Sequence, residues 1–291
     1  AVRLVHGFTP GGISDVLARA LGAKLSQSMG QQVLVDARPG AGTTIASELI
    51  AKSPADGYTL FLQDITTHAI NASLYRKLPS DSVRDFTPIT LVAASPLMLL
   101  VHPSLPVKSV KDLVALAKKH PNEILHGSSG NGTIVHLAAE MLKSMAGVRM
   151  VHVPYKGSPQ AVAGLLNGEV AVSFATLPPS LPMIAAGRLR ALGVTTPERN
   201  GAAPDVPTMK EGGLKDFELV LYTGILAPRG TPRSVVDRVN SEFGKAVRLP
   251  DIQKIYSKVG AVPITSTPDE LAAHINTEMA KLGKLLQLSG G

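Results

Sequence analysis

Short apolar runs typical of β-strands alternate along this sequence with longer segments in which apolar residues recur every three or four positions, as in an amphipathic helix. The expected strands are Arg3–Phe8, Gln32–Asp36, Tyr58–Leu62, Ile124–Leu125, Met150–Val153, Val170–Phe174 and Arg190–Val194. The expected helices span residues 13–28, 43–52, 109–119, 133–145, 158–167, 179–186, 232–247 and 267–287. This alternation predicts an α/β fold in which right-handed crossovers build mainly parallel sheets flanked by helices.

Two glycine-bearing turns each follow an expected strand and precede an expected helix. The first lies in LVHGFTPGGISDVLARAL, residues 4–21, and the second in ILHGSSGNGTIVHLAAEML, residues 124–142. The first N–H groups of a helix have no partner inside it and attract anions. Ligands of parallel α/β sheets bind at the carboxyl ends of the strands. We therefore expect the two turns to face each other across a cleft and to hold the carboxylate of a small solute.

Chain length and the placement of prolines predict two lobes. The 291 residues suffice for two cores, at about 150 residues per domain. Prolines cluster at 103–106 and at 204–232, on either side of a middle segment. The apolar runs Ile89–Val101 and Leu219–Ala227 are then expected to carry the chain into and out of that segment as a two-strand hinge that permits closure. The expected division is lobe one from residues 1–100 and 222–291, and lobe two from residues 101–221.

Composition narrows the class of protein. The chain is 44% hydrophobic and 18% charged, as in a well-packed globular protein. It has no cysteine, which excludes disulfides, thiolate metal sites and a cysteine nucleophile. The net charge of +7 comes without a basic run and with only 4% aromatic residues, so it favours anionic solutes, or plain solubility, over nucleic acid. The chain opens on an expected strand, so we expect that a signal peptide was removed or never existed.

The first turn has the residues of a preformed cradle. Pro10 fixes the backbone before Gly11 and Gly12, which are conformationally permissive. A tight connection capped by Ser14, with no ligand contact, is an equal alternative. For Asp15, satisfying the positive end of the helix is favoured over a catalytic role.

The second turn, residues 128–133, matches no nucleotide-binding or hydrolase motif. It lacks the Gly-Lys-Ser/Thr ending of a phosphate loop, and Val135 interrupts a GxGxxG pattern. His126 and Asn131 occupy outer glycine positions of the possible Gly-x-Ser-x-Gly elbows. Hydroxyls and backbone donors remain, and these suit a carboxylate.

Other polar residues carry weaker signals. His136 and Glu140 lie four apart on one expected helix, where a helical contact is favoured over a metal pair because no third ligand is near. Tyr155, Lys156 and Gly157 follow a strand and can place a hydroxyl and a donor at the mouth of lobe two, with a solvated lysine as the equal alternative. The remaining histidines are scattered singly and are expected to be structural; they include His6, His68 and His152.

A series of segments in a fixed order resembles a known family. The segments are TPGGISDVLARALGAKL, QVLVDARPGAGTTIASELIAKSPADGYTL, KLPSDSVRDFTPITLVA, SSGNGTIVHLAAEMLKSMAGVRMVHVPYKG, PDVPT and LAPRGTP. From about Val2 to the last helix, the chain resembles the Bug-type periplasmic receptors of tripartite tricarboxylate transporters. The resemblance implies a two-lobed, periplasmic-binding-protein-like (type II) fold that closes on a small carboxylated solute and delivers it to a membrane transporter.

The resemblance also implies a set of ligand-binding residues. In that family, backbone groups, hydroxyls and ordered waters of the two turns hold one carboxylate. The positions implied in lobe one are Phe8, Thr9, Pro10, Gly11, Gly12, Asp15, Thr66, Thr67 and His68. The positions implied in lobe two are Ser128, Gly130, Asn131, Gly132, Thr133, His136, Tyr155, Lys156, Gly157, Ala175 and Thr176.

Two of these positions depart from the family pattern. Ala175 stands where many relatives carry Asp, which removes a group that could hold an amino group, so we expect a ligand other than an amino acid. His68 replaces a small or apolar residue. It either adds a donor near a second carboxylate or ring nitrogen, or it faces solvent.

The sequence thus predicts a periplasmic, monomeric receptor with no catalytic activity, metal or cofactor. Its expected ligand is a small mono- or dicarboxylate, aliphatic or aromatic, and its expected partners are integral membrane transporter subunits rather than nucleic acid. One alternative is a two-lobed transferase or hydrolase with Ser128 or Ser129 as nucleophile, although no base with an orienting acid is visible. Another is the effector-sensing part of a transcription regulator, although no helix-turn-helix segment is present.

Overall fold

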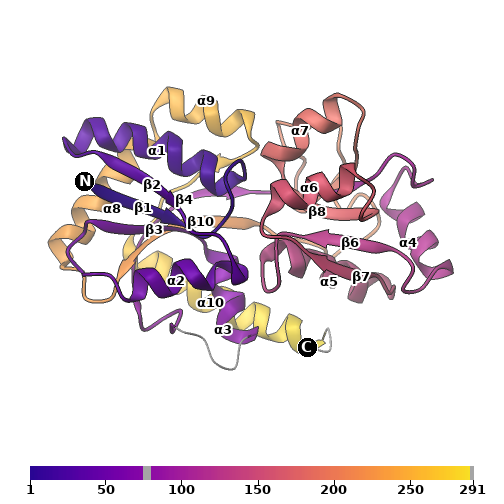
Figure 1. Cartoon of the computed structure of the whole chain (residues 1–291), viewed down its shortest axis with the longest axis horizontal. Coiled ribbons are helices and arrows are strands. Elements are labelled where there is room, and N and C mark those ends of the chain that lie inside the picture. Colours follow the sequence, from indigo (N-terminus) through magenta and orange to yellow (C-terminus); the bar gives the residue numbers. More distant parts are fainter. Residues whose placement is uncertain (75–79, 289–291) are drawn as a thin grey trace.

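The computed structural model describes residues 1–74 and 80–288, which form two α/β lobes lying side by side (Figure 1). Residues 77–79, where one of the family-like segments begins, lie outside the described residues. The two-lobed α/β fold expected from the sequence is confirmed. No helix in the described part of the chain combines the length and hydropathy needed to cross a bilayer.

The first lobe is built on a six-stranded sheet in the order β11-β4-β10-β3-β1-β2. Its strands are β1 (Val2–His6), β2 (Val33–Ala37), β3 (Thr59–Asp64), β4 (Phe86–Ser95), β10 (Leu221–Pro228) and β11 (Val262–Pro263). β1 pairs in parallel with β2 and β3, whereas β10 runs antiparallel to β3 and β4. The carboxyl ends of β1 and β3 therefore lie at the same edge of the sheet.

Side-chain alternation along the strands explains the helix layers on the two faces of this sheet. Leu4 on β1 belongs to the core cluster shared with one helix layer, and its neighbour Val5 belongs to the cluster shared with the other. The first layer contains α1 (Ile13–Met29), α8 (Arg233–Val247) and α9 (Pro250–Lys258). The second contains the short η1 (Ala41–Thr43) with α2 (Thr44–Ala51), α3 (Ile65–Leu74) and α10 (Pro268–Leu288).

The second lobe repeats this plan on a five-stranded sheet in the order β7-β6-β8-β5-β9. Its strands are β5 (Leu97–Val101), β6 (Leu125–Ser128), β7 (Val151–Pro154), β8 (Val172–Thr176) and β9 (Arg190–Val194). β6 pairs in parallel with β7 and β8. Its helices are α4 (Val110–Lys119), α5 (Ile134–Ala146), α6 (Ser158–Leu166) and α7 (Leu177–Ala185).

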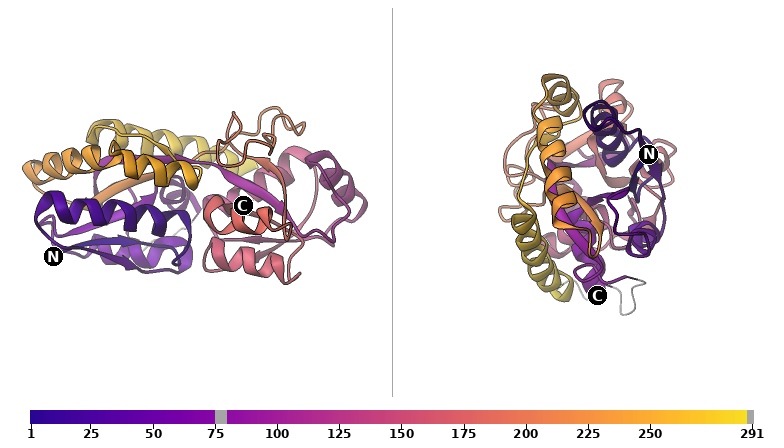
Figure 2. Two further views of the ribbon diagram at one scale, coloured as in Figure 1. Left: turned by 90° about the horizontal axis from the view of Figure 1, so that it is seen from above. Right: turned by 90° about the vertical axis from the view of Figure 1, so that its left-hand side faces the viewer.

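The chain passes between the lobes as extended segments (Figure 2). β4 ends at Ser95 in the first sheet and β5 begins at Leu97 in the second. Leu97 N donates to Thr195 Oγ1 at 2.9 Å, and Leu219 N donates to Thr195 O at 2.9 Å, so one residue ties the outgoing and returning segments together. Because β5 pairs within the second sheet, we propose that the lobes divide at Pro96 and Val220.

Both sheets are mixed, which corrects the expectation of mainly parallel sheets. In the first, β10 and β11 bring antiparallel pairs, and in the second β5 runs antiparallel to both β8 and β9. The sheets are mixed because β4, β5 and β10 carry the chain from one lobe to the other and so do not belong to βαβ units. The parallel parts of the sheets hold the two glycine-bearing turns.

Candidate ligand-binding site

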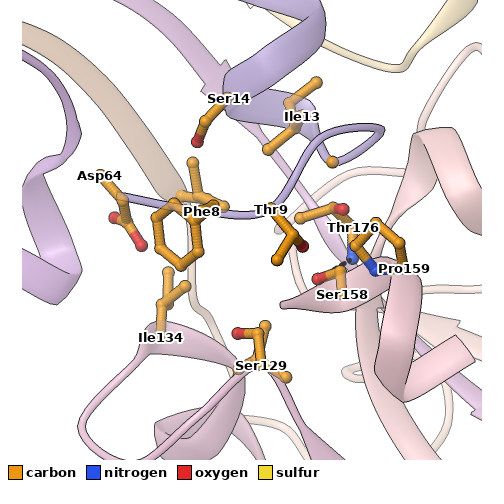
Figure 3. Close-up of a pocket in the computed structure, with 13 residues that line it drawn as sticks. Phe8, Thr9, Ile13, Ser14, Asp64, Ser129, Ile134, Ser158, Pro159 and Thr176 are labelled. Atoms are coloured by element: carbon orange, nitrogen blue, oxygen red, sulfur yellow. Dashed lines mark hydrogen bonds between the residues drawn. The ribbon is translucent and has the colours of Figure 1, made fainter. Parts of the chain in front are cut away.

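A pocket lies between the two lobes and is lined by residues from both (Figure 3). It has an empty volume of about 320 Å³. Lobe one contributes Phe8, Thr9, Gly12, Ile13, Ser14, Asp64 and Leu221. Lobe two contributes Ser129, Ile134, Val135, Ser158, Pro159 and Thr176.

A second hollow adjoins this pocket and shares Phe8 and Ser129 with it. Its empty volume is about 740 Å³. The residues around it come from the loop at 40–43 in lobe one and from the turns after β6 and β7 in lobe two; they include Gly40, Gly42, Gly130, Asn131, Tyr155 and Lys156.

Five helices begin at the pocket wall. Ile13, Ile134 and Ser158 are the first residues of α1, α5 and α6. Thr176 is the N-cap of α7, and Asp64 directly precedes α3. Each helix start brings the positive end of its dipole to the pocket, and the starts of α1 and α5 also bring backbone N–H groups, so these starts favour an anion. Pro159 in α6 and Pro178 and Pro179 in α7 have no N–H to donate.

The start of α1 is arranged by backbone geometry and by Asp15. Gly11 has φ +86°, in the left-handed region that favours glycine, and its N–H donates to Asp15 Oδ2 at 3.0 Å. The cap position, Gly12, has no side-chain cap, so Ser14 does not cap this helix. Burial alone raises the pKa of Asp15, but hydrogen bonds from Arg19 and Gly11 outweigh it and lower that pKa. Asp15 thus serves the helix start, and it does not line the pocket.

The start of α5 is fixed by hydroxyls within the second turn. Thr133 is the N-cap, and its Oγ1 accepts from His136 N at 3.3 Å. Thr133 Oγ1 donates to Gly130 O at 2.8 Å and accepts from Ser129 Oγ at 3.0 Å. Gly130 has φ +126°, which only glycine adopts without strain. The turn is therefore a rigid cradle whose Ser129 faces the pocket.

Hydrogen bonds between described residues join the lobes across the cleft. Thr9 Oγ1 donates to Gln160 Oε1 at 2.8 Å. Ile134 N, at the start of α5, donates to Thr67 Oγ1 of α3 at 3.1 Å. Asn200 Nδ2 donates to Gly260 O at 2.9 Å. The structure therefore shows the lobes in contact, in a closed arrangement.

Asp64 is a buried carboxyl group in the pocket wall. It caps α3, because its Oδ1 accepts from Thr66 N at 3.0 Å and from Thr67 N at 3.2 Å, and its Oδ2 accepts from Thr67 Oγ1. Burial raises the pKa of Asp64 to about 7, although these hydrogen bonds lower it in part. Asp64 is not among the site residues predicted from the sequence.

Asp64 gives the protein a pH dependence with an unusual sign. A carboxyl group whose pKa is higher in the folded state stabilises most at low pH, and that contribution is lost as pH rises through the folded pKa. We expect the free energy of unfolding of the natural protein to fall by about 2 kcal/mol between about pH 4 and about pH 7, relative to Asp64→Asn. Urea denaturation at a series of pH values measures this. Parallel curves for the two proteins would contradict it.

The structure places the expected site residues in three groups. Those that line one of the two hollows are Phe8, Thr9, Gly12, Gly130, Asn131, Tyr155, Lys156 and Thr176. Those that shape the turns, the helix starts or the contact between lobes are Gly11, Asp15, Thr66, Thr67, Ser128, Gly132, Thr133, His136 and Gly157. The third group lines neither hollow and makes none of these contacts; it consists of Pro10, His68 and Ala175. A ligand contact at each of these residues stays a prediction.

His68 lines neither hollow and does not face solvent, which agrees with the structural role expected for the single histidines. Its ring is buried, its Nε2 is 2.7 Å from Ser82 O, and it packs edge-on against Phe86 at 4.9 Å between ring centroids. Burial lowers the pKa of His68 to about 4, so it is a neutral residue of the lobe-one interior. Ala175 is likewise fully buried, in the core of lobe two beside Met98 and Val162.

Three histidines stack behind the second turn. The rings of His136 and His152 are 4.1 Å apart, and those of His152 and His126 are 5.0 Å apart. His136 Nε2 lies 3.6 Å from Glu140 Oε1, so the helical contact expected for this pair is confirmed. In the described residues no group of His, Asp or Glu is arranged to hold a metal ion.

This stack predicts a loss of stability in acid. Burial lowers the pKa of His126 to about 3 and that of His152 to about 4, so the unfolded chain binds more protons below about pH 6.5. From these two histidines we expect a fall of about 3 kcal/mol in the free energy of unfolding between about pH 6.5 and about pH 4, opposite in sign to the contribution of Asp64. His126→Phe should reduce this fall by about half, measured by urea denaturation. An unchanged slope in the variant would contradict the assignment.

The serines of the second turn lack the arrangement of a nucleophile. Ser128 Oγ is 2.6 Å from His152 Nε2, but Ser128 is fully buried and lines neither hollow. Ser129 faces the pocket, but its Oγ donates to Thr133 Oγ1. Among the described residues, the serine that lines the pocket therefore has no base beside it, and the serine beside an imidazole does not line the pocket.

Comparison with known proteins agrees with this geometry. A family model described as a tripartite tricarboxylate transporter family receptor matches residues 17–290. The chain belongs to this receptor family. It is 39% identical over 280 residues to a UPF0065 protein from the tcbD-tcbE intergenic region of Pseudomonas sp. strain P51, covering 96% of this chain and 83% of the relative. It is 33% identical over 290 residues to Protein BugT of Bordetella pertussis, covering 99% and 89%.

Solved structures of similar proteins share the whole fold. Rpa4515 of R. palustris with adipate superposes with a TM-score of 0.95 at 37% identity, covering 99% of this chain and 97% of that one. MatC (Rpa3494) of Rhodopseudomonas palustris with bound malate gives a TM-score of 0.93 at 28% identity, covering 98% of both. The family and these neighbours are solute-binding proteins and not enzymes, so the transferase or hydrolase alternative has no support.

Proposed function

We propose that this chain is a periplasmic receptor that binds a small organic carboxylate between its lobes and delivers it to the integral membrane subunits of a tripartite tricarboxylate transporter. The observation that carries the proposal is the convergence of helix starts from both lobes on one pocket. Adipate in Rpa4515 and malate in MatC are both carboxylates, which supports the ligand class. We propose that the receptor acts as a monomer.

Closure is the mechanism that this site supports. The α1 start belongs to lobe one, and the starts of α5, α6 and α7 belong to lobe two. A ligand that bridges them makes its full set of contacts only when the lobes meet, so it favours the closed form by its differential affinity. Ordered waters can bridge part of these hydrogen bonds at little cost in enthalpy. The closed form is the state that the membrane subunits are proposed to recognise.

The lining suggests what surrounds the carboxylate. Phe8, Ile13, Ile134, Val135 and Leu221 present apolar surface to the pocket. An acid with an aliphatic or aromatic body would bury that body against these side chains, while its carboxylate meets the helix starts. The ligand is thus proposed to be a small acid with an apolar body, in place of a fully polar one.

Calorimetric titration with a panel of organic acids tests the proposal. At least one small carboxylate is expected to bind with a micromolar or lower dissociation constant, about 8 kcal/mol or more of binding free energy. The methyl ester of the same acid serves as the matched control and is expected to lose at least about 100-fold in affinity, because it carries no charge for the helix starts. No binding by any acid, or equal binding of acid and ester, would contradict the proposal.

A further inference from the structure

Of the five helix starts around the pocket, that of α3 has its carboxylate in the pocket wall itself, whereas Asp15 in the first turn of α1 does not line the pocket. Asp64 precedes α3, lines the pocket, and receives the N–H groups of Thr66 and Thr67. At α1, α5, α6 and α7 the residues that line the pocket include no carboxylate. The two sides of the pocket therefore differ in charge, and they favour different parts of a ligand.

Asp64 keeps room for one more hydrogen bond. An ionised carboxylate has about four lone-pair positions. Three are occupied, by Thr66 N, Thr67 N and Thr67 Oγ1, so Oδ2 keeps one. Figure 3 shows the carboxylate turned toward the space between Phe8 and Ile134. The free position can accept a hydrogen bond from a ligand and has none to donate while the group is ionised.

Two buried hydroxyl groups near the pocket have unused bonding capacity. Thr223 lies directly opposite Asp64 in the antiparallel pairing of β10 with β3, on the strand face shared with the pocket residue Leu221. Its Oγ1 is fully buried and has no hydrogen-bond partner among the described residues. Thr176, which lines the pocket itself, also has a buried Oγ1 without a partner in the part of the chain that is described. Unpaired buried hydroxyls are costly, so polar ligand atoms are expected beside them.

We infer that Asp64 is a specificity-determining residue that selects a carboxylate ligand whose far end carries a hydrogen-bond donor, a hydroxyl or an ammonium group. The inference rests on the proposed carboxylate-binding function and narrows its ligand class. The ligand carboxylate meets the starts of α1 and α5, and its donor meets Asp64 Oδ2. A second ionised carboxylate at that end is repelled by Asp64 and is bound weakly. Asp64 thereby supplies a carboxylate for an amino group, which Ala175, standing where many relatives carry Asp, cannot supply.

The described groups that act on Asp64 include no cation that would neutralise its carboxylate. Glu278 on α10, itself buried, is the charged residue that acts on Asp64, and it has the same sign. The neighbours from the other elements, which are Thr66 and Thr67 of α3, Thr223 of β10 and Ile134 of α5, carry no charge. Burial raises the pKa of Asp64 to about 7, so its ionised fraction grows through the neutral range and the preference for a donor grows with it.

Titration calorimetry with two matched series of acids tests the inference. The series are butanoate, 4-hydroxybutanoate, 4-aminobutanoate and butanedioate, and the six-carbon hexanoate, 6-hydroxyhexanoate, 6-aminohexanoate and hexanedioate. At about pH 8.5, in the chain length that fits, we expect the hydroxy or amino acid to bind about tenfold or more tighter than the plain acid and the diacid. The hydroxy and amino arms show which donor is preferred. A diacid that binds as tightly as either would overturn the inference.

Asp64→Asn keeps the size and the capping oxygen but removes the charge. In this variant the diacid is expected to gain about tenfold and the amino acid to lose about tenfold. Asp112→Asn, at the start of α4 and away from the pocket, is the matched control and should leave the order unchanged. If Asp64→Asn does not fold, the natural protein decides, because its preference for the amino acid over the diacid must rise between about pH 6 and about pH 8.5. If the order of affinities changes neither in Asp64→Asn nor with pH, the inference is wrong but the proposed function stands. If no acid binds at all, both the inference and the proposed function are wrong.

Discussion

Gly157→Val is expected to abolish ligand binding, with a loss of affinity of at least about 1,000-fold, while both lobes stay folded. Gly157 is the cap residue of α6 in lobe two, and a Cβ placed there would lie less than 3.0 Å from Thr9 Oγ1 of lobe one. Its φ of 174° is extended backbone, which any residue adopts, so the substitution strains no turn. The side chain therefore acts as a wedge between the lobes. Calorimetry measures the affinity, and thermal melting shows that the fold persists.

Two further variants separate the wedge from a general effect of replacing glycine. A Cβ at Gly201, on the surface of lobe two, meets nothing within 4 Å, so Gly201→Val should bind as the natural protein does. Gly157→Ala combined with Thr9→Ala removes the atom that the new Cβ would strike, and it should recover part of the affinity that Gly157→Ala alone loses. Full binding by Gly157→Val would show that the lobes need not meet around the ligand.

Ser129→Asp is expected to weaken carboxylate binding by about 1,000-fold. Ser129 is buried at the pocket wall, where it contacts Thr133 Oγ1 at the start of α5. A carboxylate at this position occupies the helix start and repels the ligand; two like charges about 4 Å apart at an effective dielectric constant of about 20 interact by about 4 kcal/mol. That energy corresponds to about three powers of ten in the dissociation constant. Competition calorimetry with the tightest acid found for the natural protein measures the loss.

The matched control for this charge is Ser129→Asn, which has the same size and no charge. It should keep the affinity within about tenfold, because it can still hydrogen-bond within the turn. Equal losses in Ser129→Asp and Ser129→Asn would mean that crowding of the pocket, and not charge, decides binding at this wall. The helix-start account of carboxylate recognition would then be wrong.

Much of the fold could be predicted because most elements have a regular apolar period. β9 was placed at Arg190–Val194 from the sequence and is found there. α3 was missed, because its residues Thr66, Thr67, His68 and Asn71 are polar and yet buried. They find partners at Asp64, Ser82 O and Gly42 O, which only the folded chain brings near. The buried apolar residues Ile65, Ala69 and Ile70 were too few among them to stand out as a stripe.

A second helix was missed although it carried a signal. α9 begins at Pro250, a favoured first helical residue, and buries Ile252 and Tyr256 four positions apart. It has nine residues, and the rest of its surface is polar, so its short apolar stripe did not stand out. The mixed character of the sheets was missed for a different reason. Strand direction at the crossings depends on how the two lobes are joined, which no local pattern encodes.

Part of the site was predicted from the sequence. Two helix starts were expected at the pocket, those of α1 and α5, because glycines mark their turns. The starts at Ser158 and Thr176 also follow strands, but their turns carry prolines and hydroxyls in place of paired glycines. Asp64 could have been found by the same rule, since it ends β3 at the edge where β1 also ends. The apolar wall at Ile134 and Leu221 depends on closure of the lobes and has no sequence signal.

The central claim is that helix starts from both lobes jointly hold one carboxylate. The most direct test is a crystal structure of the protein with the tightest small acid found by calorimetry. The account predicts a carboxylate between the starts of α1 and α5, within hydrogen-bond reach of N–H groups near Ile13 and Val135, directly or through one water. A ligand whose carboxylate points to solvent, or which contacts one lobe alone, would contradict it.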